Sequence, residues 1–71
     1  MNNQVWEPTT AELVRSYLKA AGDFRTAAEI AQAIGRSPYQ VRAELQNQLE
    51  RERVRRELPT HYRPQRYRWV A

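Results

Sequence analysis

Apolar residues recur at helical spacing in three segments of the chain. The apolar positions are Leu13, Val14, Tyr17, Leu18 and Ala21, then Ile30 and Ile34, and then Val41, Leu45 and Leu49. Residues three or four apart lie on one face of an α-helix, so each segment predicts an amphipathic helix with one buried side. We therefore expect helices over about residues 10–21, 27–34 and 37–49.

Each predicted helix begins at a capping-box pattern, in which Thr or Ser is followed three residues later by Glu or Gln. The pairs are Thr9 with Glu12, Thr26 with Glu29, and Ser37 with Gln40. The two side chains of a box each accept a hydrogen bond from a backbone N–H that the start of a helix leaves free. Gly22 and Gly35 follow the first two helices and supply left-handed ends. Because only residues 35–37 separate the last two helices, these form a predicted helix-turn-helix.

After Glu50 the hydrophobic pattern changes from helical to alternating, over residues 54–58 and again over residues 66–70. Alternation places successive side chains on opposite faces of a β-strand. The last run puts two aromatic side chains, Tyr67 and Trp69, on one face. We expect a β-hairpin whose inner face buries both of them in the core.

The order of the predicted elements is that of a winged helix. Phe24 lies in a short β stub between the first two helices, and we expect it to be buried while its backbone pairs with a later strand. Residues 59–64 contain two prolines, which predicts a wide and stiff hairpin tip. The side chains at this tip are His61, Tyr62 and Arg63. We predict an α+β winged helix, a three-helix helix-turn-helix core with a C-terminal β-hairpin wing, over residues 9–71 after a flexible N-terminus of residues 1–8.

Positive charge is concentrated near the C-terminal end of the sequence. The 71 residues carry a net charge of +4. Residues 1–50 hold five basic and six acidic groups, whereas residues 51–71 hold seven arginines and two acidic groups. All basic residues except Lys19 are Arg, whose planar guanidinium binds phosphate through two parallel hydrogen bonds. This distribution favours a polyanion as the binding partner.

The sequence offers little for catalysis or for metal binding. It has no cysteine, one histidine and no glycine-rich phosphate loop. No acidic pair shares a helical face, so neither an acid–base pair nor a metal cluster is indicated. We expect no enzymatic activity, no metal and no cofactor. No signal peptide and no apolar run of about 20 residues is present, so we expect a cytoplasmic, nucleoid-associated protein without membrane association.

The predicted third helix carries outward-facing side chains of the types that read base edges. Gln and Asn pair with adenine, Arg pairs with guanine or phosphate, and Ala contacts the thymine methyl group. We predict that this helix enters the major groove of double-stranded DNA while the wing contacts phosphates or the minor groove. The candidate DNA contacts are Arg36, Ser37, Tyr39, Gln40, Arg42, Ala43, Gln46 and Asn47 in the helix-turn-helix, and Arg55, Tyr62, Arg63, Arg66 and Arg68 in the wing.

Other interpretations of this polar face stay open. Phages and plasmids encode small winged-helix modules that bind a host protein rather than DNA. The acidic residues Glu44 and Glu50 on the predicted third helix weakly favour such a role, because negative charge there disfavours DNA. A merely solvated helix face is a second alternative. RNA or single-strand binding is disfavoured, because the exposed aromatic residues do not form a stacking platform.

The chain also resembles a known family over about residues 10–70. The resemblance rests on Thr26-Ala27-Ala28-Glu29-Ile30-Ala31, Ala33-Ile34-Gly35, Ser37, Tyr39-Gln40-Val41-Arg42, Leu45, Leu49, Tyr67 and Trp69. These residues are similar to those of the small fimbrial operon regulators of the PapI and FaeA type. The resemblance implies a bacterial or phage winged-helix transcription regulator whose third helix faces DNA. It also implies a larger regulatory protein as a partner, and a second copy of the chain is a further possible partner.

Overall fold

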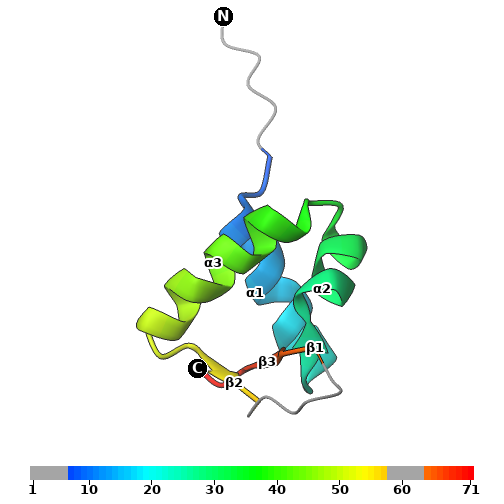
Figure 1. Cartoon of the computed structure of the whole chain (residues 1–71). Coiled ribbons are helices and arrows are strands. Elements are labelled where there is room, and N and C mark those ends of the chain that lie inside the picture. Colours follow the sequence, from blue (N-terminus) through cyan, green and yellow to red (C-terminus); the bar gives the residue numbers. More distant parts are fainter. Residues whose placement is uncertain (1–6, 58–63) are drawn as a thin grey trace, which may run out of the picture.

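The computed structural model describes residues 7–57 and 64–71 and contains three helices and three strands in that part of the chain. The elements are α1 (Thr10–Ala21), β1 (Arg25–Thr26), α2 (Ala27–Ile34), α3 (Pro38–Glu50), β2 (Val54–Arg56) and β3 (Arg66–Trp69). The helices pack on one another, and the small sheet lies at the end of this helical layer (Figure 1). The predicted α+β class is confirmed, and this arrangement is compatible with a winged helix. Residues 1–6 of the predicted flexible N-terminus lie outside the described residues.

The helix starts form as their sequence patterns predict. The hydroxyl oxygens of Thr9, Thr26 and Ser37 each accept a hydrogen bond from the backbone N–H three residues later, at 3.0–3.1 Å. Glu29 and Gln40 return the bond to the N-cap backbone N–H of α2 and α3, at 2.8 and 3.1 Å. Only the first of the two bonds forms at α1 among the described residues. The bond from Thr26 lowers the pKa of Glu29, because a backbone N–H donates to the ionised carboxylate.

Left-handed residues follow the helices, but only two of these residues are glycines. Gly22 and Gly35 end α1 and α2 with φ values of 65° and 70°, as predicted. After α3 the left-handed residue is Glu52, with a φ of 58°, and its backbone N–H donates to the carbonyl of Leu49 at 3.0 Å. A side chain in this conformation costs roughly 1–2 kcal/mol. The turn from α3 into β2 therefore contains a residue, Glu52, in a backbone conformation that residues with a side chain disfavour.

The sheet is antiparallel, with β3 between β1 and β2. The predicted pairing of the early β stub with a later strand is confirmed, but it begins one residue after Phe24, with Arg25 opposite Tyr67. The Phe24 backbone N–H instead donates to the carboxylate of Asp23 at 2.7 Å. This local turn removes Phe24 from the ladder and leaves its side chain half-buried.

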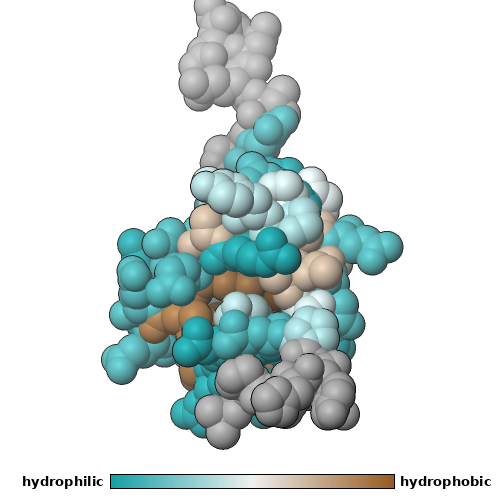
Figure 2. Space-filling view, viewed as in Figure 1, coloured by the Kyte–Doolittle hydropathy of each residue, from teal (hydrophilic) through white to brown (hydrophobic). Residues whose placement is uncertain are grey.

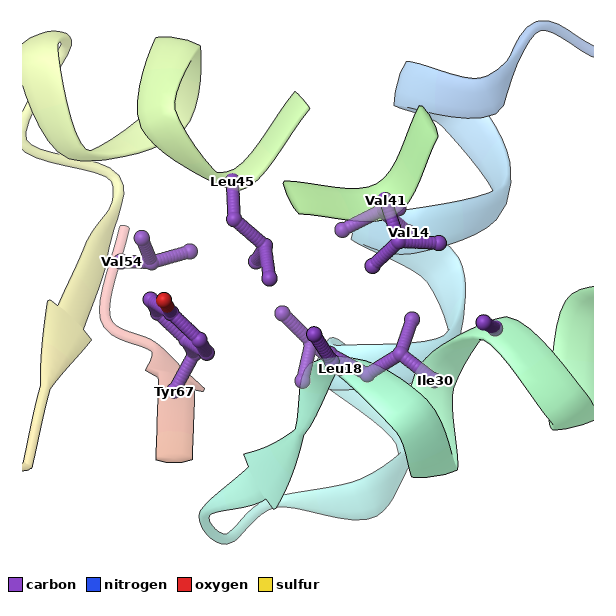
Figure 3. Packing of buried hydrophobic residues seen from close by; sticks show 9 residues of the cluster. Val14, Leu18, Ile30, Val41, Leu45, Val54 and Tyr67 are labelled. Carbon is purple, nitrogen blue, oxygen red and sulfur yellow. The ribbon is translucent and has the colours of Figure 1, made fainter. Parts of the chain in front are cut away.

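The core is built by all three helices and closed by the sheet (Figure 3). Its fully buried side chains are Val14, Leu18, Ile30, Val41 and Leu45. Tyr67 is buried as predicted, whereas Trp69 packs against the core but is only half-buried. Trp69 ends β3, and its indole N–H donates to the carbonyl of Ala71 at 2.7 Å near the surface. A tryptophan needs a partner for this N–H, which explains why the predicted full burial of Trp69 is wrong.

Candidate nucleic-acid interface

Helix α3 presents a polar face to solvent. Its buried side is formed by Val41 and Leu45, and the capping box at Ser37 fixes where the helix begins. Hydrophilic side chains cover much of the face on which α3 lies (Figure 2). All the predicted contacts on α3 are exposed, namely Tyr39, Gln40, Arg42, Ala43, Gln46 and Asn47. Tyr39 stands out, because 81% of its surface is exposed.

Gln40 and Ser37 differ from the other predicted contacts because they bond to each other. The Oε1 atom of Gln40 accepts from the Ser37 backbone N–H at 3.1 Å and from the Ser37 hydroxyl at 3.2 Å. Reading adenine through two hydrogen bonds needs this oxygen as a free acceptor beside the amide N–H donor. Gln40 would have to break the cap of α3 to read adenine in that way. We therefore assign both residues to positioning α3.

Replacing Ser37 with Ala should lower the free energy of unfolding by about 1 kcal/mol, because the backbone N–H of Gln40 loses its acceptor. Urea unfolding followed by circular dichroism measures this loss. Ser16, an exposed serine inside α1, provides the matched control, and Ser16→Ala should cost nothing because Ala is the better helix former. Equal stability of the Ser37 variant and the parent chain would contradict the capping role.

Arg36, in the turn before α3, is half-buried. One of its nitrogens, Nη2, donates to the carbonyl of Pro8 at 3.3 Å. This bond ties the chain before α1 to the turn of the helix-turn-helix. Arg36 therefore already has a structural contact, although it keeps further donors for a phosphate.

Arg42 is exposed and lines a cavity of about 230 Å³ on one flank of α3. The other residues that line it are Thr26, Ala27 and Ala28 at the start of α2, and Pro64, Gln65 and Tyr67 on the chain that leads into β3. Ala28 and Gln65 are not among the residues predicted from the sequence, since spacing along the chain does not reveal which segments approach α3 in space. Arg42 therefore lies at the junction of α2, α3 and the sheet.

Two arginines lie directly opposite each other on the sheet. Arg55 of β2 faces Arg68 of β3 in the antiparallel register, and both side chains are exposed. Within residues 7–57 and 64–71, no acidic side chain lies within 4 Å of either guanidinium. Like charges at directly opposite positions destabilise a sheet. This pair therefore places two positive charges side by side without an ion-pair partner among the described residues.

Arg66 is engaged within the fold, unlike its neighbours on the sheet. Its Nε donates to Glu57 Oε1 at 3.1 Å, and its Nη2 forms an ion pair with Glu57 Oε2. The guanidinium also lies over the ring of Phe24, 5.8 Å from the centroid. Hydrogen bonding to Glu57 raises the pKa of Arg66. Arg66 is therefore already paired within the fold, because the register of β2 and β3 brings Glu57 beside its guanidinium.

The remaining predicted contacts, Tyr62 and Arg63, lie outside the described residues, as does His61. Over residues 7–57 and 64–71, no group of three His, Cys, Asp or Glu side chains could hold a metal ion. No helix of that part is long and apolar enough to cross a membrane. Comparisons with protein-family models, with curated proteins and with solved structures each found no match. The resemblance to PapI-type regulators therefore stays a prediction.

Proposed function

We propose that this chain is a transcription regulator that binds double-stranded DNA through a winged helix. The order of elements along the chain, α1-β1-α2-α3-β2-β3, is the one expected for a winged helix, and β3 lies between the other two strands. In this proposal α3 enters the major groove, and the outer face of β2 and β3 contacts phosphates. DNA bound in this way would contact both the basic surface of the sheet and the polar surface of α3.

The opposed Arg55–Arg68 pair is the observation that carries the proposal. Two arginines at facing positions repel each other in the free domain, and no acidic side chain of the described residues lies within 4 Å of either guanidinium. A polyanion placed over the pair would turn this repulsion into attraction, since each guanidinium could bind a phosphate through two hydrogen bonds. Nucleic acid supplies such closely spaced negative charges.

The outward face of α3 favours duplex DNA over other polyanions. An α-helix is about 10–12 Å wide with its side chains, close to the width of the major groove. Gln46 and Asn47 are exposed on α3, and in the described part of the chain no hydrogen bond engages their side chains. Their amide groups can accept and donate at once, which is the combination that reads adenine.

A host-protein partner is the rival function, and acidic residues on α3 would favour it. The carboxylate of Glu44 is half-buried and accepts a hydrogen bond from Gln48 at 2.5 Å. Glu50 is thus the acidic residue that stays exposed on this helix. The negative charge available to a basic host protein is therefore small, which supports DNA over the rival.

Replacing Arg55 or Arg68 with Ala should weaken binding to a duplex of random sequence. We expect about a fivefold loss for each arginine, which corresponds to roughly 1 kcal/mol. The matched control is Arg56→Ala, which removes the same charge from the next residue of β2, opposite Tyr67 and on the other face of the sheet. Fluorescence anisotropy measures the affinities, and circular dichroism checks that each variant is folded. Equal losses for Arg55 and Arg56 variants would contradict a contact specific to the outer face.

A further inference from the structure

A second, smaller cavity lies between the start of α1 and the end of α3. Its volume is about 60 Å³, and it is lined by Ala11, Glu12, Arg15, Gln48 and Arg53. At 3.6 residues per turn, Gln48 is displaced from Arg42 by roughly 120° around the axis of α3. The two cavities therefore lie on different flanks of the proposed DNA-reading helix.

Gln48 is a buried polar side chain with an unsatisfied atom. Its exposed fraction is 4%, and its Nε2 donates to the Glu44 carboxylate at 2.5 Å. Its Oε1 has no hydrogen-bond partner among the described residues. Because Nε2 donates to a carboxylate, the orientation of the amide is settled, and Oε1 is left as an acceptor that requires a donor.

The cavity supplies such donors in Arg15 and Arg53, whose side chains are both exposed. The backbone of Arg53 is held on both sides, since its N–H donates to the Gln48 carbonyl and its own carbonyl accepts from Val70, each at 2.9 Å. Glu12 is the carboxylate that lines this cavity, but no ion pair joins it to either arginine within the described residues. A guanidinium has five N–H donors, so it can bond to Gln48 and still bind an anion.

We infer that Arg15 and Arg53 form a second site for DNA-backbone phosphate and that Gln48 is its positioning residue. This inference rests on the proposed function. Arg53 continues β2, two residues before Arg55, and its carbonyl accepts from the N–H of Val70 in the same ladder. Because Arg15 of α1 lines the same cavity, the two arginines extend the basic surface of the sheet toward α1. In the DNA complex, Gln48 Oε1 would accept one N–H of a guanidinium and so orient the remaining donors toward phosphate.

The double variant Arg15→Ala/Arg53→Ala tests the site through the salt dependence of binding to a random-sequence duplex. Each lost phosphate contact should reduce the slope of log K against log salt by about 0.9, so the double variant should lose about 1.8. Lys19→Ala is the matched control, since Lys19 is exposed one turn further along α1 and does not line the cavity. An unchanged slope in the double variant, with a steep slope in the parent chain, would overturn the inference and leave the proposed function standing. A flat slope in the parent chain would overturn both.

The role of Gln48 is tested by Gln48→Met, which keeps a long side chain but removes the acceptor. In the parent chain this change should weaken binding about threefold to tenfold, whereas in the Arg15→Ala/Arg53→Ala background it should have no effect. A purely structural role would weaken binding equally in both backgrounds, and that result would overturn the positioning role. Unfolding curves of all variants exclude a loss of fold as the cause, and the arginine variants test the site even if Gln48→Met is unstable.

Discussion

Replacing Leu45 with Ala is expected to lower the free energy of unfolding by about 2–5 kcal/mol. Leu45 is completely buried, and its side chain points from α3 toward Leu18 of α1 in the middle of the core (Figure 3). A domain of this length has only a few kcal/mol of stability to lose. The variant should therefore be partly or fully unfolded at room temperature, which far-ultraviolet circular dichroism in a urea titration measures.

The control for this variant is Leu49→Ala, one turn further along α3. Leu49 is only half-buried, so its truncation leaves a smaller cavity and should cost less than that of Leu45. An unchanged free energy of unfolding for the Leu45 variant in the urea titration would mean that α3 buries a different face. The polar surface proposed to read DNA would then be assigned to the wrong side of the helix.

Replacing Gln46 with Ala should cost about 1–3 kcal/mol of binding free energy on a preferred DNA site and much less on random DNA. Gln46 lies on the exposed side of α3, one turn from Arg42, and its amide can meet a base edge in the groove. The preferred site is obtained by selecting bound duplexes from a random pool. The affinities of parent and variant are then compared on the selected duplex and on the pool.

Gln32→Ala is the control for Gln46, since Gln32 is exposed on α2 and outside the proposed reading face. Gln40→Ala should instead reduce folding stability, because Gln40 accepts hydrogen bonds from the α3 cap. Equal losses of affinity on selected and random DNA would show that Gln46 contacts DNA without distinguishing its sequence. Retained DNA binding, together with lost binding to a host protein, would favour the protein-interaction module.

The helices were predictable because their signals are local. A capping residue, its partner three positions later and an apolar residue on every turn all lie within one segment of chain. Thr26 and Ser37 therefore mark the starts of α2 and α3, and Gly22 and Gly35 mark the ends of α1 and α2. The exposed side of α3 follows from the same periodicity. Only the end of α3, where Glu52 adopts the left-handed conformation, lacks its usual glycine signal.

The features that sequence did not predict depend on contacts between distant segments. Arg66 alternates with Tyr67 as an outward residue should, but the hairpin register places Glu57 within reach of its guanidinium. Likewise, Arg15 and Arg53 belong to separate segments and come together with Gln48 only through the packing of α1 on α3. The hydrophobic pattern predicts which face of a helix or strand is buried. The partner of a charged side chain depends instead on how distant segments pack in the fold.

The most direct test of DNA binding is the affinity of the parent chain for a labelled random-sequence duplex between about 50 and 200 mM salt. Arg55, Arg68, Arg15 and Arg53 are all proposed to contact phosphate, and each contact should contribute about −0.9 to the slope of log K against log salt. We therefore expect a straight line with a steeply negative slope, of about −3.6 from these four arginines alone. A slope near zero would contradict DNA binding by this domain.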